Sequence, residues 1–156
     1  MSKNKLTKID NDILWHMQRD GRLTNAKLAN ELAMSESPCW RRLKRLEEEG
    51  YIESYQANLD RRKLGFGVLA FVQLTCTEHD SDTTTAFEAV IQHCDQVLSC
   101  HNTTGDADFL LQVVAKDLDD YSRFIDGTLR KLPGVTAIRS SLSLRELKAS
   151  SRLPVR

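Results

Sequence analysis

The apolar positions of this chain follow two periods, a helical one in the first third and a strand-like one in much of the remainder. Before residue 33 the pattern predicts two helices. The first begins at Thr7 or Asp10 and is ended by Gly21, and the second is shorter and is capped by Thr24. Their expected inward positions are Ile9, Ile13, Leu14 and Met17 in the first helix, and Ala26, Leu28, Ala29 and Leu32 in the second.

The stretch from Ser35 to Gly50 predicts a third helix with marked ends. The hydroxyl of Ser35 or Ser37 can cap its first turn, and Pro38 is tolerated there because the first turn has no need of that amide donor. Gly50 favours the left-handed conformation that ends many helices. Its narrow apolar stripe consists of Cys39, Leu43 and Leu46. Trp40 borders this stripe, so we expect it to be a core or wedge residue.

The opposite side of the third helix bears a hydroxyl at its start and is strongly basic afterwards. It carries Ser37, Pro38, Arg41, Arg42, Lys44 and Arg45. Four cations in five residues suit a helix that lies against a polyanion, although a basic run taken alone is equally typical of a solvated helix face. Only residues 33–35 separate this helix from the second one, and so tight a turn forces a steep crossing, as in a helix-turn-helix. The pattern therefore predicts a three-helix unit whose third helix enters the major groove of DNA.

The segment 51–57 is extended and alternating, and predicts a short strand that is either a wing or a linker strand. Residues 58–65 form the boundary, with one helical turn after Asp60 that is closed by Gly65. We therefore expect a DNA-binding domain at 1–57, a linker at 58–65, a second domain at 66–149 and an unassigned tail at 150–156.

The second domain predicts the order βαββαβ, which is the ferredoxin-like arrangement. The expected strands are 66–77, 97–104, 109–115 and 135–144, and the expected helices are 80–93 and one that is capped by Asp117 and stopped by Pro133. The aligned apolar positions of the two helices are Phe87, Val90, Ile91 and Cys94, and Leu118, Tyr121, Ile125, Leu129 and Leu132. The first strand is apolar on both faces in its first half, which favours burial of the helix-free sheet face against another subunit.

The total charge is uninformative, with 22 basic and 22 acidic residues, but its distribution is uneven. Residues 1–63 carry 13 Lys and Arg against 10 Asp and Glu, and the remainder carries 9 against 12. This asymmetry fits a nucleic-acid-binding module joined to another module. The sequence shows no apolar run of membrane-spanning length and no secretory signal, and its four cysteines are not in a Cys-x-x-Cys pattern. We expect a cytoplasmic, nucleoid-associated protein with reduced cysteines.

In its motifs and their order the chain resembles the leucine-responsive regulatory protein and asparagine-synthase activator (Lrp/AsnC) family of transcription regulators. The matching segments are Asp10-Asn11-Asp12-Ile13-Leu14, Gly21-Arg22-Leu23-Thr24, Ser35 to Glu47, Gly50-Tyr51-Ile52, Thr104 to Leu111, and Leu132-Pro133-Gly134-Val135. Two positions depart from the family pattern. The turn before the third helix has Ala33-Met34 where glycine is frequent, and Ala107 stands where an aromatic residue is frequent.

The resemblance implies a regulator that binds double-stranded DNA and whose assembly responds to a small effector, usually an amino acid. It implies a homodimer formed through the sheets, which assembles further into a tetramer or octamer, with the effector bound between dimers. It implies neither enzymatic activity nor a cofactor.

The expected DNA contacts divide by their position on the third helix. Ser35, Ser37, Pro38 and Arg41 lie early enough to approach base edges, and Arg can bind guanine through two hydrogen bonds. Arg42, Lys44 and Arg45 complete the basic face, of which Lys44 and Arg45 are better placed for phosphates.

The expected effector site surrounds the turn at residues 105–108, although Gly and Asp are also typical of an ordinary hairpin turn. With the resemblance, Gly105 lets a ligand approach the backbone, and Asp106 or Asp108 binds an amino group; Asp108 is equally compatible with a structural role. His101, Thr103 and Thr104, on the strand that leads in, are candidates for the pocket rim.

Three rival interpretations start from the cysteines and histidines. The pairs His93-Cys94 and Cys100-His101, with Cys76 and His79, suggest a metal site, but their spacing matches no usual zinc pattern. A small enzyme on a ferredoxin-like scaffold would need converging acid, base or nucleophilic groups, which the scattered His and Cys do not indicate. A DNA-binding redox sensor would use Cys94 and Cys100.

Overall fold

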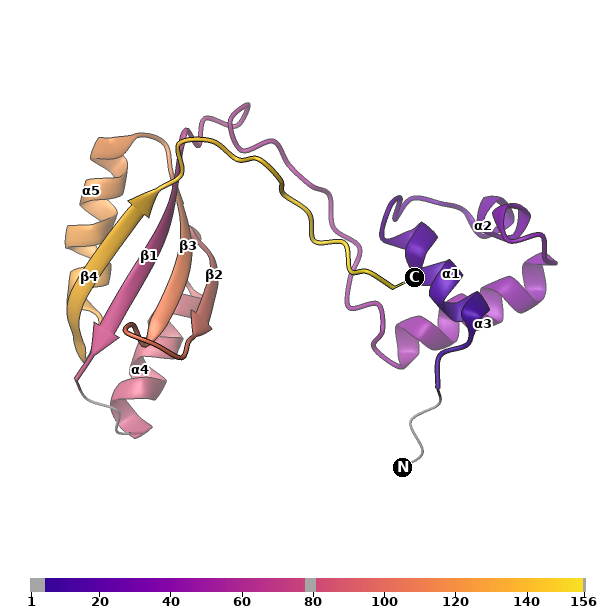
Figure 1. The fold of residues 1–156 in the computed structure, drawn as a ribbon, viewed down its shortest axis with the longest axis horizontal. Helices are drawn as coiled ribbons and strands as arrows, with labels where there is room; N and C mark the ends of the chain where they lie inside the picture. The colour runs from indigo at the N-terminus through magenta and orange to yellow at the C-terminus, as the bar shows by residue number, and fades with distance from the viewer. Residues whose placement is uncertain (1–4, 78–80, 156) are drawn as a thin grey trace. The chain divides into compact units, whose positions relative to one another are not determined.

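A computed structural model describes residues 5–77 and 81–155, and the chain divides into two compact units (Figure 1). The first unit contains Met1–Asn58 together with Lys148–Arg156, and the second contains Leu59–Leu147. Among the described residues no helix has both the length and the apolar character that crossing a membrane requires.

The first unit contains three helices, α1 (Lys8–Met17), α2 (Asn25–Glu31) and α3 (Glu36–Glu48), which confirms the predicted trihelical arrangement. They enclose a core of buried residues, namely Ile13, Met17, Leu28, Ala29, Cys39 and Leu46. Two expected inward positions are wrong, because Ile9 is 41% exposed and Ala26 is exposed. The first helix also ends at Met17, before Gly21.

The turn between α2 and α3 is a Schellman motif, in which two amides beyond the helix satisfy its last carbonyls. The Ala33 amide donates to the Asn30 carbonyl, and the Met34 amide donates to the Ala29 carbonyl at 3.0 Å. Ala33 has a φ of +50°, a left-handed conformation that glycine adopts without strain. The tight turn is thus retained although Ala33 stands where glycine is favoured.

Helix α3 begins after Ser35, but its expected hydroxyl cap is absent, because no side-chain capping hydrogen bond is formed. The Asn25 side chain instead donates to the Glu36 carbonyl at 2.9 Å, which ties the start of α3 to the start of α2. At the other end Gly50, with a φ of +75°, closes the helix as predicted. Both helix ends are therefore fixed by the backbone and by α2 rather than by serine.

The strand expected at 51–57 does not form; this segment is extended but pairs with no strand in the described chain. Tyr55 anchors it, because its hydroxyl donates to the Glu47 carboxylate at 2.8 Å. Burial and this hydrogen bond raise the pKa of Tyr55 to about 12. A hydrogen bond to α3 thus holds the segment for which a short strand was expected.

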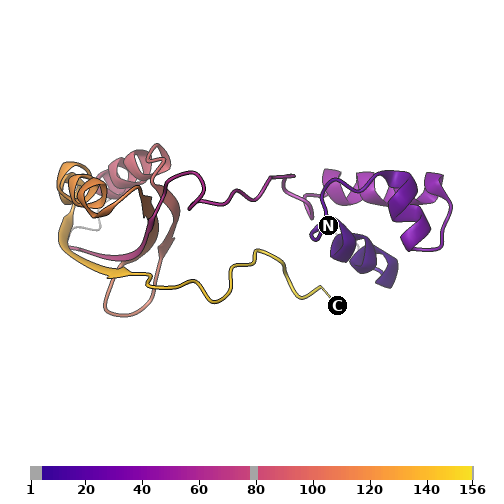
Figure 2. The same ribbon diagram turned by 90° about the horizontal axis from the view of Figure 1, so that it is seen from above.

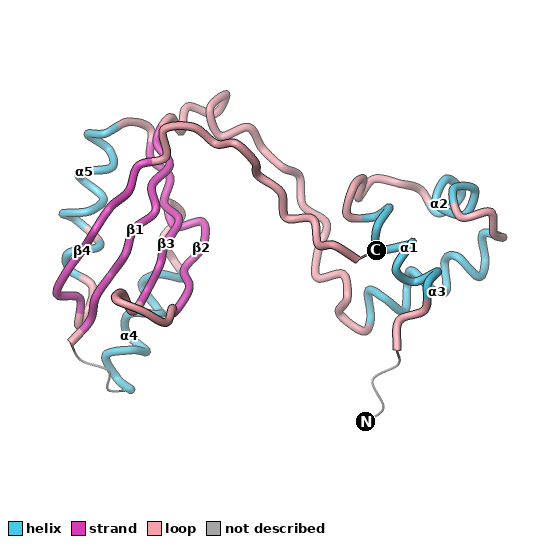
Figure 3. The backbone as a smooth tube through the Cα atoms, in the orientation of Figure 1, coloured by secondary structure: helices cyan, strands magenta, loops and turns pink. Residues whose placement is uncertain are grey.

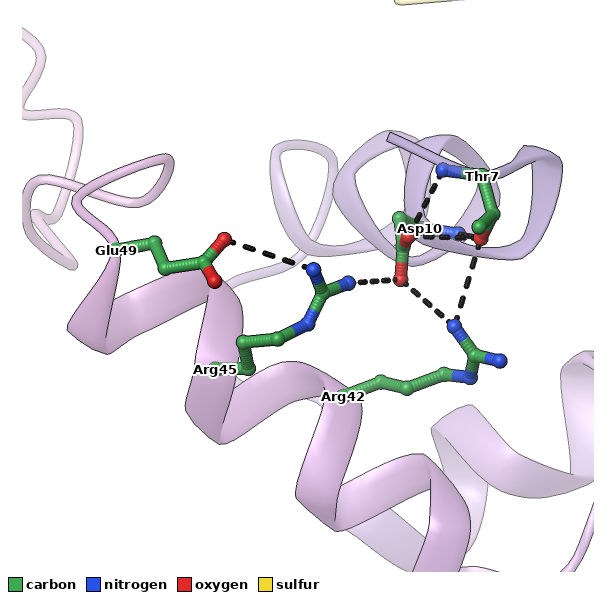
Figure 4. Close-up of polar contacts among 5 residues, drawn as sticks. All are labelled: Thr7, Asp10, Arg42, Arg45 and Glu49. Atoms are coloured by element: carbon green, nitrogen blue, oxygen red, sulfur yellow. Dashed lines mark hydrogen bonds and ion pairs between the residues drawn. The ribbon is translucent and has the colours of Figure 1, made fainter. Parts of the chain in front are cut away.

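Asp10 fastens α1 to α3 (Figure 4). Its side chain is completely buried, and its carboxylate lies 3.1 Å from the Arg42 guanidinium and 2.8 Å from that of Arg45. Thr7 closes a capping box, with its amide and its hydroxyl donating to the same carboxylate at 2.9 and 2.7 Å. Burial alone would raise the pKa of Asp10, but the hydrogen bonds from Thr7, Arg45 and Arg42 lower it from 3.8 to about 2.

The C-terminal segment is also held by α1. The side-chain Nε2 of Gln18 donates to the Leu153 carbonyl at 2.9 Å, and the backbone amide of Leu153 donates to the side-chain Oε1 of Gln18 at 2.8 Å. The tail, which the sequence left unassigned, is therefore held to the helical unit by two hydrogen bonds between the Gln18 side chain and the Leu153 backbone.

The second unit is a four-stranded antiparallel sheet in the order β2-β3-β1-β4, which confirms the ferredoxin-like prediction (Figure 3). Its elements are β1 (Val68–Cys76), α4 (Ser81–Gln92), β2 (Val97–Asn102), β3 (Phe109–Ala115), α5 (Leu118–Gly127), a 3₁₀ turn (Leu129–Lys131) and β4 (Val135–Leu142). Both helices cover the same face of the sheet (Figure 2). The expected helix start at Asp80 lies outside the described residues.

The core of this unit lies between the sheet and its two helices. It includes Ala70, Val72 and Leu74 of β1, Leu111 and Val113 of β3, and Phe87, Ile91, Tyr121 and Phe124 of the helices. Two expected core positions are wrong, since Val90 is 42% and Leu118 is 59% exposed. On the helix-free face Phe71 is 42% exposed, whereas Leu69 is buried within the chain itself.

We predict that Ala33→Gly stabilises the first unit by about 0.5–1 kcal/mol, because glycine removes the left-handed strain at a φ of +50°. The matched control is Ala26→Gly in the first turns of α2, which should destabilise by a similar amount. Urea unfolding followed by tryptophan fluorescence measures both changes, since both tryptophans, Trp15 and Trp40, lie in this unit. Equal destabilisation by the two changes would contradict the left-handed turn.

We predict that Asp10→Asn removes on the order of 2 kcal/mol of stability at neutral pH, the value that corresponds to a pKa lowered from 3.8 to about 2. A carboxylate whose pKa is lowered by folding stabilises fully above its unfolded pKa and loses this effect as pH falls through its folded pKa. The difference between wild type and variant should therefore shrink between about pH 4 and pH 2.

Unfolding free energies measured at several pH values test this prediction, with Glu48→Gln on the exposed side of α3 as the control. A constant difference between wild type and Asp10→Asn across this range would exclude the assigned role of the carboxylate.

Candidate DNA-binding and effector-binding sites

The exposed side of α3 includes a stripe of four residues at helical spacing, Ser37, Trp40, Arg41 and Lys44, and the acidic residues Glu36 and Glu48 are also exposed, at the two ends of the helix. The four residues of the stripe stand at positions i, i+3, i+4 and i+7, so they lie side by side along the helix. Cys39 and Leu46, which are completely buried, fix the opposite face in the core. The fold therefore presents a hydroxyl, an indole and two cations to the surroundings, and we call these four residues the α3 stripe.

Trp40 corrects the sequence interpretation. It was expected in the core or as a wedge at its border, but its side chain is 54% exposed. The reason is rotational, because Cys39 points into the core and the next residue is turned by about 100° around the helix axis. Trp40 consequently belongs to the α3 stripe and not to the apolar stripe.

The four predicted cations of α3 fall into two pairs with different surroundings. Arg42 and Arg45 point toward Asp10 on α1, and Arg45 also lies 3.5 Å from Glu49 (Figure 4). The Lys44 side chain is 49% exposed, and its Nζ lies 3.6 Å from the Glu47 carboxylate. Arg41 is also exposed. Arg42 and Arg45 thus fasten the helix, whereas Arg41 and Lys44 face outward.

A shallow, largely open hollow of about 410 Å³ lies beside the start of α3 and is lined by Asn25, Glu36, Ser37, Trp40 and Arg41. Ser35 is exposed and Pro38 half-buried at this end of the helix. The buried Oδ1 of Asn25 accepts no hydrogen bond from the described residues, while its amide nitrogen holds Glu36. The first turns of α3 therefore border a concave surface that is shared with α2.

The predicted effector residues lie in and beside the β2–β3 loop. Gly105 has a φ of +121°, which favours glycine, and Asp106 and Thr104 beside it are exposed. His101 is exposed on β2, where it pairs with Leu110 of β3. The structure thus gathers Thr104, Gly105 and Asp106 at the loop tip, with His101 further back on the strand.

Asp108 and Thr103 maintain this loop. The Asp108 carboxylate accepts from the Cys76 amide at 2.7 Å, where the β1–β4 pairing is irregular, and its amide donates to the Leu74 carbonyl at 2.9 Å. The Thr103 hydroxyl donates to the Ala107 carbonyl at 2.9 Å. Of the two aspartates, Asp108 has the structural role that the sequence left open, and Asp106 is the one presented outward.

The cysteines give little support to redox or metal chemistry. Burial raises the pKa of Cys39, Cys76, Cys94 and Cys100, and the carboxylates of Asp108, Asp95 and Glu88 add to this effect at the last three, respectively. A raised pKa reduces the thiolate fraction on which reactivity and metal binding depend. Across residues 5–77 and 81–155 no group of three potential ligands could hold a metal ion, and His79 lies outside the described residues.

Sequence reasoning did not foresee the roles of three residues in the first unit, Asp10, Asn25 and Trp40. The signal for Trp40 was present, since it stands three residues after Ser37 and four before Lys44. Asp10 was visible only as a capping residue of α1, because its contact with α3 spans 32 residues. No local pattern indicated that Asn25 would hold Glu36.

Two family models match the chain in the order of its two units. The winged helix-turn-helix DNA-binding model matches residues 6–53, and the Lrp/AsnC ligand-binding domain model matches residues 69–153. The first match contains α1 to α3, and the second begins inside β1, at Leu69, and contains the rest of the sheet.

Relatives of known identity extend the likeness over nearly the whole chain. The leucine-responsive regulatory protein of Salmonella typhimurium is 35% identical over 97% of this chain and 92% of its own length. The crystal structure of the Neisseria meningitidis transcriptional regulator NMB0573 with L-Met has a TM-score of 0.93 and 38% identity, covering 97% of each chain. An AsnC family transcriptional regulator from Agrobacterium tumefaciens has a TM-score of 0.91 and 30% identity, covering 96% of this chain and 97% of that one. The chain therefore belongs to the Lrp/AsnC family, whose members are DNA-binding transcription regulators and not enzymes.

Proposed function

We propose that this protein binds double-stranded operator DNA through the α3 stripe and that an amino acid bound at the β2–β3 loop controls this binding. The observation that carries the proposal is the division of the cations on α3. Asp10 holds Arg42 and Arg45 against α1, so that Arg41 and Lys44 extend from a helix whose position is fixed. A rigid helix with outward cations is suited to entering a major groove.

The stripe offers different chemistry along its length. Ser37 and Arg41, with Pro38, stand early on the helix and are proposed to approach base edges, where an arginine can discriminate guanine. Lys44, one turn later, is proposed to contact phosphate, which supplies affinity without sequence information. Arg42 and Arg45 retain donors beyond those that bind Asp10, and Ser35 is exposed, so their DNA contacts remain predictions.

The effector is proposed to be an amino acid. The relative from Neisseria meningitidis was crystallised with L-Met, and this chain presents Gly105 and Asp106 at an exposed loop tip. A backbone that approaches closely at Gly105 can bind a carboxylate through amide groups, and the Asp106 carboxylate can bind an ammonium group. Thr104 and His101 are proposed to border the ligand, and Asp108 and Thr103 to hold the loop.

Assembly is proposed to transmit the signal. The helix-free sheet face carries the exposed Phe71, and we propose that it pairs two copies into a homodimer that assembles into tetramers or octamers. A dimer places two α3 helices on half-sites about one DNA turn apart. An effector that prefers one assembly over another must then shift the arrangement of the DNA-binding units. Such a regulator acts in the cytoplasm, at the nucleoid.

We predict that Lys44→Ala weakens binding to all duplexes alike and lowers the slope of log affinity against log salt by about one for each phosphate contact removed. Arg41→Ala should instead relax the preference for one base pair, by about 1–3 kcal/mol. Fluorescence anisotropy over a salt series measures both effects, with Arg130→Ala on the second unit as the control, since this arginine is 66% exposed. Unchanged binding by Arg41→Ala together with Lys44→Ala would refute the proposed DNA-binding surface.

We predict that one or more of the twenty amino acids raises the melting temperature of the second unit, because a ligand that binds only the native state stabilises it by mass action. At a concentration of one hundred times Kd the gain is about 2.7 kcal/mol. Asp106→Ala should abolish the shift, whereas Asp95→Ala, another exposed aspartate of the same unit, should retain it. A shift that persists in Asp106→Ala would place the ligand elsewhere.

A further inference from the structure

Trp40 is the one large apolar side chain of the α3 stripe, and it does not belong to the core that the described residues of the first unit form. It is 54% exposed on a helix whose buried face is completed by Cys39 and Leu46. Its neighbours along the stripe, Ser37, Arg41 and Lys44, are all polar. Leaving an indole in water forfeits the burial energy of a large apolar surface, so the fold itself gains little from a tryptophan at this position.

The surroundings of Trp40 indicate what kind of partner covers it. It lines the hollow of about 410 Å³ together with Ser37, Arg41, Asn25 and Glu36. Arg41 and Lys44, the cations of the same stripe, favour a polyanion over a second protein surface. If that polyanion is DNA, the apolar group that Trp40 can contact in the major groove is a thymine methyl group, which no other of the four bases carries.

We propose that Trp40 is a specificity-determining residue that contacts the C5-methyl group of one thymine in each operator half-site. The inference rests on the proposed function, since it requires α3 to lie in the major groove. Arg41 and Lys44 supply charge, Ser37 a hydroxyl, and Trp40 the apolar surface that distinguishes thymine from cytosine at the same place in the groove. The energetic gain is that of removing one methyl group from water, which corresponds to about fourfold in affinity.

The experiment begins with duplexes that the wild-type protein selects from a random-sequence library. Each dT of the selected half-site is then replaced by dU, which removes only the methyl group. We expect one position at which dU weakens wild-type binding by about fourfold and leaves the binding of Trp40→Ala unchanged. A wild-type protein that tolerates every dU, or a Trp40→Ala variant that keeps the full preference for dT, would overturn the inference.

Controls separate this inference from the proposed function. Because Trp40 carries no charge, Trp40→Ala should keep the salt dependence of non-specific binding, and because it is exposed, it should keep the melting temperature. Ile9→Ala, which removes another exposed apolar side chain of the same unit, should keep the dT preference. If the wild-type protein selects no sequence at all, the proposed function fails, whereas selection that is indifferent to Trp40 overturns only the inference.

A spectroscopic measurement tests the same contact directly. Trp15→Phe leaves Trp40 as the sole tryptophan, since the chain contains two. Its emission should shift to shorter wavelength when the selected duplex covers it, and the shift should be smaller with the single critical dT replaced by dU. Emission that stays that of a solvent-exposed indole in the complex contradicts the contact.

Discussion

One buried carboxylate fastens α3 to α1. Asp10 has no exposed side-chain surface, and burying a charge is costly unless it is paired and hydrogen-bonded. Here it receives hydrogen bonds from Thr7 of its own helix end and from Arg42 and Arg45 of α3. Since these groups come from two helices, the carboxylate is satisfied only when α1 and α3 are correctly placed. The contact therefore fixes the orientation of α3 relative to α1 more strictly than the apolar packing of a small core would alone.

This arrangement explains how one short helix can serve both its fold and its partner. Arg42 and Arg45, which contact Asp10, stabilise α3 on one side. The charged residues of the α3 stripe, Arg41 and Lys44, face outward on the other side. The chain leaves this unit after Asn58 and returns to it from Lys148, where Gln18 holds the Leu153 backbone. The DNA-binding unit is consequently attached at two points in the sequence to the domain that senses the effector.

Much of this organisation could be predicted because it depends on local chemistry. Thr24, Asp117 and Gly50 marked helix ends by their own hydrogen bonds and backbone freedom, and each was confirmed. The apolar and β-branched composition of residues 66–77 predicted a strand, and Val72 and Leu74 of β1 are buried in the core. The order of strands and helices then left few topologies, of which the ferredoxin-like one was found.

The remainder depends on contacts between distant residues, which no local pattern contains. Asp10 resembled a capping residue until α3 was placed beside it, and two predicted DNA-binding arginines proved to be its partners. Trp40 was expected inward because it is apolar, yet the helix rotation set by Cys39 turned it outward. The segment 51–57 was expected to be a strand, but it is held instead by a hydrogen bond from the Tyr55 hydroxyl to the Glu47 carboxylate. At the β2–β3 loop the sequence could not separate Asp106 from Asp108, because only the sheet reveals that the Cys76 amide donates to the Asp108 carboxylate.

The proposed DNA-binding surface is the α3 stripe, on a helix that Asp10 holds from behind. Photo-crosslinking tests it most directly, with a photoreactive amino acid placed singly at positions 37, 41 and 44, at position 13 in the buried core, and at position 126 on the second unit. If the α3 stripe binds DNA, the three positions on the stripe should crosslink to a bound duplex and the other two should not. Crosslinks confined to position 126, or none from positions 37, 41 and 44 while the duplex remains bound, would contradict it.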